Sequence, residues 1–455
     1  MASRVSSKPV ALILLAAGQG SRMNSDLPKV LHQIGSAPLA VHALRAATAL
    51  EPEKTVVVTG HGADKVEATL SKHYDDLIFA RQTEQNGTAH AVDQARSALE
   101  GFAGDAVVLY GDTPFVSGDT LQHMADARKT ADVVVLGFKA DKPGRYGRLI
   151  TNGASLEKIV EAKDATAEQL AVKLCNSGVI MCQSQTLFEL ISEVQNNNAT
   201  GEFYLTDIVG LARERGLTAV AVTCDEAETL GINTREELAA AERTFQTRMR
   251  AEAMETGVSL ADPDSTFFAY DTVLGRDAMI GPNVVFGPDV TVESGAEIKA
   301  FCHLEGCHVS QGSVVGPFAR LRPGAELEEG AKVGNFVEIK NATLAEGAKV
   351  NHLSYVGDAH VGAGANIGAG TITCNYDGVF KHRTTIGAGA FIGSNTLLIA
   401  PVDVGADAMT GSGTVVTEDV PDGDLALSRV RQTNKAGFAR KLMQMLRAKK
   451  MKKDA

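Results

Sequence analysis

An apolar or small residue returns at every sixth position through much of the C-terminal part of this chain. The residues in this rhythm are Leu274, Ile280, Phe286, Val292, Ile298, Leu304, Val315, Leu321, Leu327, Val333, Ile339, Ile386, Ile392, Leu398, Val404, Thr410 and Val416. A helix repeats every 3.6 residues and a strand every two, so neither explains this period. A parallel β-helix of hexapeptide repeats does, because each hexad supplies one short strand whose apolar residue points inward. The sequence therefore predicts a β-helix from about residue 257 to about residue 420.

The rhythm is interrupted at three places. A solenoid of identical coils offers no distinct position for a catalytic site, so we expect such a site at the interruptions. Leu304 to Val315 spans eleven residues, which we interpret as a kinked coil without a chemical role. Ala345 to Val361 spans sixteen residues and Thr373 to Ile386 spans thirteen. The polar and aromatic residues suited to catalysis fall in the second and third interruptions: Asn351, His352, Ser354, Tyr355, Asn375, Tyr376 and Asp377.

His352 is the candidate general base, because the unperturbed pKa of histidine lies near neutral pH. Two alternatives stay open from the residues alone. A histidine on the solvent side of a coil often has no role, and histidines of neighbouring coils can also hold zinc. The histidines available for a zinc site are His303, His308, His352, His360 and His382.

The first half of the chain alternates fully apolar runs with helical patterns. The runs are 10–15, 55–59, 106–110 and 132–138. Such alternation is typical of an α/β fold with a parallel sheet covered by helices, here a Rossmann-like domain. A stretch rich in helix formers follows from residue 234 to about 255. We therefore predict a domain over 1–232, a linker helix over 233–256 and a β-helix domain over 257–455.

The bulk composition restricts the partners of the chain. Its 455 residues carry a formal net charge of −11, which argues against general nucleic-acid binding. No apolar stretch approaches the length of a membrane span. The six cysteines form no C-x-x-C pair, which is typical of a reduced, cytoplasmic protein. Small molecules are thus the expected partners. The basic tail over 431–455, with nine Lys or Arg, is either a solvated segment or a contact for an anionic ligand.

The first apolar run leads into the sequence Leu-Ala-Ala-Gly-Gln-Gly-Ser-Arg-Met, residues 15–23, with Pro28-Lys29 shortly after. A glycine-rich turn at the end of a first strand lets backbone N–H groups approach phosphate oxygens. The cations Arg22 and Lys29 suit a triphosphate whose charge must be offset during attack at phosphorus. Asp112 follows another apolar run, where it either caps a turn or binds magnesium.

These residues resemble the sugar-1-phosphate nucleotidylyltransferase family, whose signature is L-A-A-G-x-G-[ST]-R-M followed by P-K. Together with the hexads, they resemble the bacterial bifunctional N-acetylglucosamine-1-phosphate uridylyltransferases/glucosamine-1-phosphate N-acetyltransferases. The resemblance implies acetylation of glucosamine 1-phosphate with acetyl-CoA, followed by UMP transfer from UTP. The products would be UDP-N-acetylglucosamine, for cell-wall and lipopolysaccharide precursors, and pyrophosphate. It also implies Mg²⁺ and a homotrimer. The alternative is a monofunctional nucleotidylyltransferase with a structural or regulatory β-helix.

The resemblance implies roles for residues in both domains. The expected UTP and UDP-N-acetylglucosamine site comprises Leu15, Ala16, Ala17, Gly18, Lys29, Gln82, Gly87, Thr88, Tyr110, Gly111, Asp112, Gly147, Glu161, Asn176 and Asn233. Asp112 and Asn233 would be the magnesium ligands, with Arg22 and Lys29 assisting catalysis. In the β-helix, His352 would be the base.

The remaining expected residues of the β-helix bind its two substrates. Those for glucosamine 1-phosphate are Arg322, Lys340, Tyr355 and Asn366. Those for acetyl-CoA are Ala369, Asn375, Tyr376, Ser394, Ser412 and Arg429. Ser412 departs from the family, which commonly has alanine there, so its contact with acetyl-CoA is the weakest of these expectations.

Overall fold

The computed structural model describes residues 8–454, so the predicted ends of the first domain and of the tail, residues 1–7 and 455, lie outside the described residues. The chain divides into two compact units, one extending to Arg248 and the other starting at Met249. The division falls inside the helix α8 (Arg235–Glu255). This helix confirms the helix predicted from residue 234 to about 255, while its role as a spacer between domains stays a prediction.

The first unit is built on a nine-stranded sheet with the order β11-β7-β10-β6-β1-β4-β5, and β8 and β9 form a hairpin beside β10. The strands are β1 (Val10–Ala16), β4 (Lys54–Thr59), β5 (Leu77–Arg81), β6 (Asp105–Tyr110), β7 (Val133–Lys139), β8 (Arg148–Asn152), β9 (Ser155–Val160), β10 (Leu174–Gln183) and β11 (Ala219–Cys224). A separate two-stranded sheet pairs β2 (Gln33–Ile34) with β3 (Ala37–Pro38). Residues such as Ile13, Val56 and Val108 are fully buried in this sheet.

The four apolar runs of the sequence become β1, β4, β6 and β7, which all point the same way. The prediction of a parallel sheet is confirmed for these four strands, but the sheet as a whole is mixed, because β10 lies antiparallel between β6 and β7. The chain reaches β10 from the β8–β9 hairpin through one short helix, α5 (Ala167–Leu170). That connection lacks the long crossover that a parallel strand requires.

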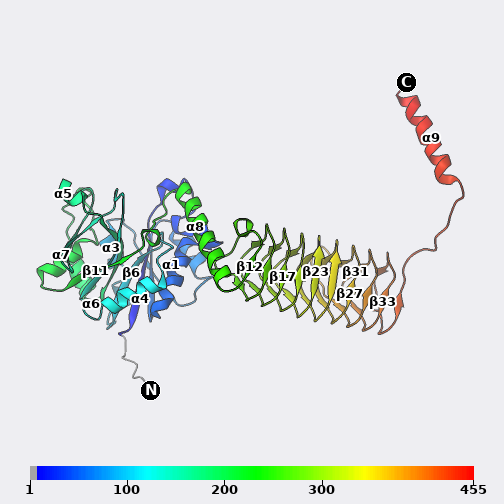
Figure 1. The fold of residues 1–455 in the computed structure, drawn as a ribbon, viewed down its shortest axis with the longest axis horizontal. Helices are drawn as coiled ribbons and strands as arrows, with labels where there is room; N and C mark the ends of the chain where they lie inside the picture. The colour runs from blue at the N-terminus through cyan, green and yellow to red at the C-terminus, as the bar shows by residue number, and fades with distance from the viewer. Residues whose placement is uncertain (1–7, 455) are drawn as a thin grey trace, which may run out of the picture. The chain divides into compact units, whose positions relative to one another are not determined.

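The helices of this unit surround the sheet (Figure 1). They are α1 (Leu39–Ala47), α2 (Ala63–Leu70), α3 (Thr88–Asp93), α4 (Gly118–Ala127), α5, α6 (Ser184–Ile191) and α7 (Asp207–Glu214). Short 3₁₀ turns lie in the connections of this unit, namely η1 (Ser21–Met23), η2 (Lys29–Leu31), η3 (Thr48–Leu50), η4 (Ser97–Leu99) and η5 (Glu226–Glu228).

The second unit is a stack of short parallel strands in two sheets, as the coils in Figure 1 show. The ten-stranded sheet contains β12 (Ser259–Leu260), β14 (Met279–Ile280), β17 (Glu297–Ile298), β20 (Val314–Val315), β23 (Lys332–Asn335), β25 (Lys349–His352), β27 (Asn366–Ile367), β30 (Phe391–Ile392), β33 (Met409–Thr410) and β35 (Leu425–Ala426). The fourteen-stranded sheet contains β13 (Val273–Leu274), β15 (Val285–Phe286), β16 (Val290–Val292), β18 (His303–Leu304), β19 (Cys307–Val309), β21 (Arg320–Leu321), β22 (Ala325–Leu327), β24 (Glu338–Leu344), β26 (Tyr355–Val361), β28 (Ile372–Cys374), β29 (Thr384–Ile386), β31 (Leu397–Ile399), β32 (Val402–Val404) and β34 (Val415–Val416). The 3₁₀ turn η6 (Pro263–Ser265) lies near the start of this unit.

The interior of the stack confirms the six-residue rhythm. All of the sixth-position residues from Ile280 onward are buried, and Leu274 packs partly buried against the same core. The first interruption, after Leu304, leaves the strands paired in parallel. Val290 pairs with Cys307 of the next coil, and Cys307 pairs in turn with Ala325. The separation in sequence between Val290 and Cys307 is one residue shorter than that between Cys307 and Ala325. A corner of the coil that is one residue shorter therefore accounts for the position missing from the rhythm.

The second interruption is not an insertion, and that part of the prediction is wrong. His352 ends β25 in register with Asn335, and Tyr355 begins β26 in register with Glu338. The inward residue is Leu344 and not its neighbour Ala345, so the rhythm continues through Val350, Val356 and Val361. The His352 segment thus belongs to a regular coil.

The third interruption is a true excursion from the stack. Ala342 pairs with Ala359, which is the spacing of an ordinary coil, but Ala359 pairs with Thr384, which lies much further along the chain. The additional residues, 375–383, leave the coil between β28 and β29 and are closed by a bridge between Tyr376 and Lys381.

The tail forms a helix, α9 (Phe438–Lys453), with no buried residue. Within residues 8–454, none of the helices has the length and apolar character needed to cross a membrane.

Candidate active sites

A cavity of about 320 Å³ opens in the first unit beside the last residues of β1 and β6. Nine of the residues expected to bind the nucleotide line it: Leu15, Ala17, Gly18, Lys29, Gln82, Gly87, Thr88, Tyr110 and Asp112. The sequence did not point to the other four, Val30, Gln85, Ala91 and Glu202. Gln85 ties the glycine-rich turn to the opposite wall, because its side-chain amide donates to the carbonyl of Ala17 at 3.0 Å.

Lys29 joins the two expected magnesium ligands. Its Nζ donates to the carboxylate of Asp112 and, at 3.0 Å, to Oδ1 of Asn233. Asn233 is brought beside Asp112 by the backbone, since the N–H of Ile232 donates to the carbonyl of Asp112 at 3.0 Å. An aspartate and an asparagine oxygen thus converge on one cation, as a hard metal ion requires.

The approach of Lys29 depends on glycine at position 20. Gly20 has φ of 66°, and a Cβ at this position would lie 2.5 Å from the Cβ of Lys29. A side chain at Gly20 would therefore push Lys29 away from Asp112.

Seven expected residues are not among those that line the cavity, namely Ala16, Arg22, Gly111, Gly147, Glu161, Asn176 and Asn233. Arg22 lies exposed in η1 and is not among the cavity-lining residues. Ala16 and Gly111 are buried in the wall, where the Gly111 N–H donates to the carbonyl of Leu15 at 2.9 Å.

Hydrogen bonds within the protein fix the side of the cavity that is expected to hold the nucleobase of UTP. The Gln82 side-chain amide lies 3.3 Å from the carbonyl oxygen of Gly87 and 3.1 Å from Nδ1 of His90. Thr88 begins α3, and its hydroxyl accepts the backbone N–H of Leu205 at 2.9 Å.

The residues expected to bind the sugar lie together on the β8–β9 hairpin and β10. The N–H of Asn176 donates to the carbonyl of Gly147 at 2.9 Å, and Gly147 lies against the Glu161 carboxylate. Burial raises the pKa of Glu161, although its bond with Thr206 partly opposes this. Burial, with the nearby charges of Asp112 and Glu161, also raises the pKa of Tyr110.

In the second unit, the expected base His352 has a partner that the sequence did not reveal. Its Nδ1 lies 2.8 Å from Oδ1 of Asn335, the residue at the same position one coil earlier. An amide oxygen only accepts, so Nδ1 carries the proton and Nε2 is left with a free electron pair. The ring of His352 is exposed, so that electron pair is accessible.

Three cations gather on the neighbouring coils. Arg322 forms an ion pair of 2.7 Å with Glu338, while its buried Nε has no partner in the described residues. The adjacent ammonium of Lys381, followed by burial and the charge of Arg322, lowers the pKa of Lys340. Tyr355 lies close enough to act on the pKa of Arg322. Lys381 was not expected from the sequence; it reaches this cluster because the excursion 375–383 folds back. Such crowded cations suit a phosphate.

Asn366, also expected at the sugar, lies on β27 in the ten-stranded sheet. It pairs in register with Lys349 of β25, the strand that ends in His352.

Asp358 holds the start of the excursion. Its two oxygens accept the side-chain amides of Asn341, at 2.6 Å, and of Asn375. Burial raises the pKa of Asp358, but the two amides and the ammonium groups of Lys381 and Lys340 outweigh it, so the pKa lies below its ordinary value. The sequence did not indicate this residue.

Three of the residues expected at acetyl-CoA follow one another along a single corner of the stack. The N–H of Asn395 donates to the carbonyl of Ala369 at 2.7 Å, and that of Gly413 to the carbonyl of Ser394 at 2.8 Å. In turn, Arg429 donates to the carbonyl of Ser412 at 2.8 Å. The contact of Arg429 with Ser412 uses the backbone carbonyl, which an alanine at this position would also provide. Tyr376 lies apart from this row, exposed in the excursion.

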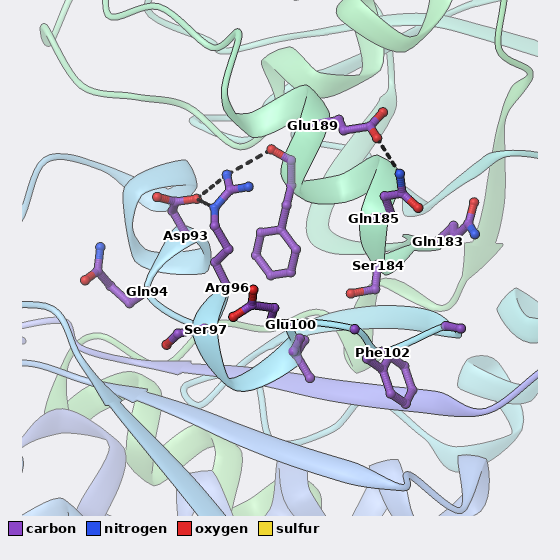
Figure 2. Close-up of a pocket in the computed structure, with 14 residues that line it drawn as sticks. Asp93, Gln94, Arg96, Ser97, Glu100, Phe102, Gln183, Ser184, Gln185 and Glu189 are labelled. Atoms are coloured by element: carbon purple, nitrogen blue, oxygen red, sulfur yellow. Dashed lines mark hydrogen bonds and ion pairs between the residues drawn. The ribbon is translucent and has the colours of Figure 1, made fainter.

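The zinc alternative gains no support. Within residues 8–454, no group of three or more His, Cys, Asp or Glu side chains is placed to hold a metal ion. A separate surface cavity between α3, η4 and α6 also lacks the expected residues. Figure 2 shows its cation, Arg96, engaged by the carboxylate of Asp93 and the backbone carbonyl of Phe188.

Comparison with known proteins finds relatives of both units. The MobA-like NTP transferase domain matches residues 12–198, and the bacterial transferase hexapeptide (six repeats) matches residues 271–306. "Bifunctional protein GlmU" of Dinoroseobacter shibae is 67% identical over 447 residues, 98% of this chain and 99% of that protein. The protein of the same name from Jannaschia sp. is 62% identical over 97% of each chain.

The chain belongs to the GlmU family. As a GlmU protein it is a bifunctional transferase, with a uridylyltransferase and an acetyltransferase activity. Its hexapeptide repeats form the left-handed parallel β-helix expected of GlmU, and such repeats are consistent with oligomerisation.

Proposed function

We propose that this protein makes UDP-N-acetylglucosamine by acetylating glucosamine 1-phosphate with acetyl-CoA and then transferring UMP from UTP. The observation that supports this most strongly is the presence of two separate polar sites, each built within one unit. The first surrounds Lys29 and Asp112, and the second surrounds His352 and the cations Arg322, Lys340 and Lys381. A β-helix with only a structural role has no need of the second site.

In the acetyl transfer, the amine of glucosamine 1-phosphate attacks the carbonyl carbon of the acetyl-CoA thioester. His352 Nε2 takes the proton that the amine loses, and the thiolate of CoA leaves. Asn335 keeps Nδ1 protonated, so the ring presents its basic nitrogen to the substrate. The cluster of Arg322, Lys340 and Lys381 holds the phosphate and so positions the amine.

In the uridylyl transfer, a phosphate oxygen of N-acetylglucosamine 1-phosphate attacks the α-phosphorus of UTP. The bond from that phosphorus to the oxygen of pyrophosphate breaks, and no protein nucleophile is needed. Lys29 offsets the charge of the phosphates, and the backbone of Gly18 borders them. Gln82 and Thr88 hold the nucleobase of UTP, while Glu161 and Asn176 bind the sugar.

Magnesium fits this site. The oxygens of Asp112 and Asn233 already converge on a cation, the ammonium of Lys29. Asp112 and Asn233 would hold the metal, which when bound neutralises phosphate charge.

A homotrimer with acyl sites between subunits completes the proposal. Phe301, Phe318 and Phe336 stack at one corner of successive coils, with ring centroids 4.8 and 5.3 Å apart. All three are exposed, and the corner continues at Leu353, next to His352. Exposed, stacked aromatic rings favour a covered interface. The trimer would work in the cytoplasm, to which its free cysteines are suited, and supply precursors of the cell wall.

The proposal is tested by following both products on one purified sample. Thiol release from acetyl-CoA is expected with glucosamine 1-phosphate but not with glucose 1-phosphate, which has no amine. Pyrophosphate release from UTP is expected with N-acetylglucosamine 1-phosphate. Equal thiol release with both sugars, or none with either, would contradict the acetyl-transfer assignment.

A further inference from the structure

We propose that Lys29 is the resident cation of the metal site in the free protein, and that metal and nucleotide together displace its ammonium onto the phosphates. The inference rests on the proposed uridylyl transfer and adds a step to it. Its basis is that the Lys29 Nζ contacts one carboxylate oxygen of Asp112 and the side-chain oxygen of Asn233, the two residues that would bind magnesium.

The carboxylate of Asp112 needs a cation where it lies. The side chains of Lys29 and Asp112 are only 13% and 21% exposed. A carboxylate so far removed from water is unfavourable unless it is paired. Lys29 supplies that pair, and its second hydrogen bond to Asn233 holds both oxygens in position for a metal ion.

Metal and ammonium compete for these oxygens. Magnesium binds oxygen at about 2.0–2.1 Å, and the ammonium sits within hydrogen-bonding distance of the same two atoms. A second positive charge at this position would also be repelled by the first. Metal binding therefore requires the Lys29 side chain to leave its present position.

The structure limits where the ammonium goes next. The side-chain stem of Lys29 lies against Gly20, where an added Cβ would be 2.5, 3.3 and 3.4 Å from the first three carbons of the stem. The stem is thus held while the end of the chain swings. Lys29 and Gly18 line the same cavity, so the released ammonium faces the phosphates of a bound nucleotide.

The consequence is a coupling between metal and nucleotide. Without nucleotide, a metal ion must separate Lys29 from Asp112 and leave the ammonium without an anion. With nucleotide bound, the phosphates accept the ammonium, and the metal enters more easily. Each ligand therefore raises the affinity for the other by the same factor.

The test measures Mn²⁺ binding to the full-length protein in the absence of nucleotide, by electron paramagnetic resonance of the free ion. Lys29→Met removes the charge and keeps the length of the side chain. We expect it to bind Mn²⁺ about tenfold more tightly than the unmodified protein, within the usual range of site coupling. The double variant Lys29→Met/Asp112→Asn should lose this gain. Lys158→Met, at an exposed lysine of the same unit, is the matched control and should bind Mn²⁺ like the unmodified protein.

Unchanged or weaker Mn²⁺ binding by Lys29→Met, with circular dichroism and melting temperature unaltered, would overturn the inference. A second measurement keeps this outcome separate from failure of the proposed function. If the unmodified protein binds Mn²⁺ with UTP and releases pyrophosphate, the metal-dependent transfer stands whatever Lys29→Met does. If it does neither, the metal site itself is wrong, and the inference falls with it.

Discussion

The Nδ1 atom of His352 lies 2.8 Å from the Oδ1 atom of Asn335, which occupies the same position one coil earlier. This contact fixes both the orientation and the protonated nitrogen of the ring. Asn335→Ala should therefore slow thiol release by about 10- to 100-fold, part of the 10²- to 10⁴-fold contribution of a general base. Steady-state kinetics with glucosamine 1-phosphate measure the effect, and an unchanged kcat would count against this role.

Asn335→Asp tests the same contact through pH. A carboxylate beside His352 stabilises the imidazolium and raises the pKa of the histidine. The base would then be free only at higher pH, so the acidic limb of the thiol-release profile should move upward. Pyrophosphate release in the same samples should keep its pH profile. A profile that does not move would show that Asn335 does not touch the catalytic ring.

Lys381 should contribute to binding of the sugar phosphate, although it lies in the excursion and not on a coil. Lys381→Met removes one of three clustered cations, and we expect the KM for glucosamine 1-phosphate to rise about tenfold, which corresponds to about 1.4 kcal/mol. Arg383→Met, at an exposed cation two residues away, provides the comparison. Equal effects of the two variants would indicate general electrostatics and not a phosphate contact.

Asp358 should stabilise the acetyl-transfer site through its two amide partners. Its pKa is lowered in the folded protein, so its contribution to stability is present above the ordinary carboxyl pKa and is lost as pH falls through the lowered value. Asp358→Asn weakens charge-assisted bonds and should cost about 1–3 kcal/mol of unfolding free energy at neutral pH. Urea unfolding at neutral pH and near pH 3 measures this. The difference between the two proteins should shrink at the lower pH, and a constant difference would contradict the assignment.

Gly20 should be needed for uridylyl transfer because of its closeness to Lys29. Gly20→Ala introduces a Cβ 2.5 Å from that of Lys29, and pyrophosphate release should fall by at least about tenfold, or 1.4 kcal/mol in the barrier. Gly153→Ala is the matched control, with φ of 59° but nothing within 4 Å of the added Cβ. Both carry a backbone penalty of about 1–2 kcal/mol, so only the loss specific to Gly20→Ala supports the role of Lys29.

The sequence predicted those parts of the fold that depend on local periodicity. The six-residue rhythm identified the buried residues of the β-helix, and the four apolar runs identified β1, β4, β6 and β7. The antiparallel strand β10 could not be anticipated, because strand direction depends on the chain path and not on the composition of the strand.

The sequence predicted some residues of the candidate sites and missed others, because the missed residues also depend on the path of the chain. The glycine-rich turn and Asp112 stand at strand ends, which are recognisable in the sequence. Asn335 and Asp358 act through coil register, which places residues from successive coils side by side although they are far apart in the sequence. Lys381 acts through the fold of the excursion, which the sequence does not indicate either. Taking Ala345 and not Leu344 as the inward residue shifted that register by one position, and it turned a regular coil into an apparent insertion.

We propose that two independent catalysts share this chain, and assays of both activities on single variants test this directly. Thiol release and pyrophosphate release are assayed on the same preparations of Asp112→Ala and His352→Ala. We predict that Asp112→Ala abolishes pyrophosphate release and leaves thiol release intact, and that His352→Ala does the reverse. Loss of both activities in either variant, with the fold intact by circular dichroism, would contradict the account.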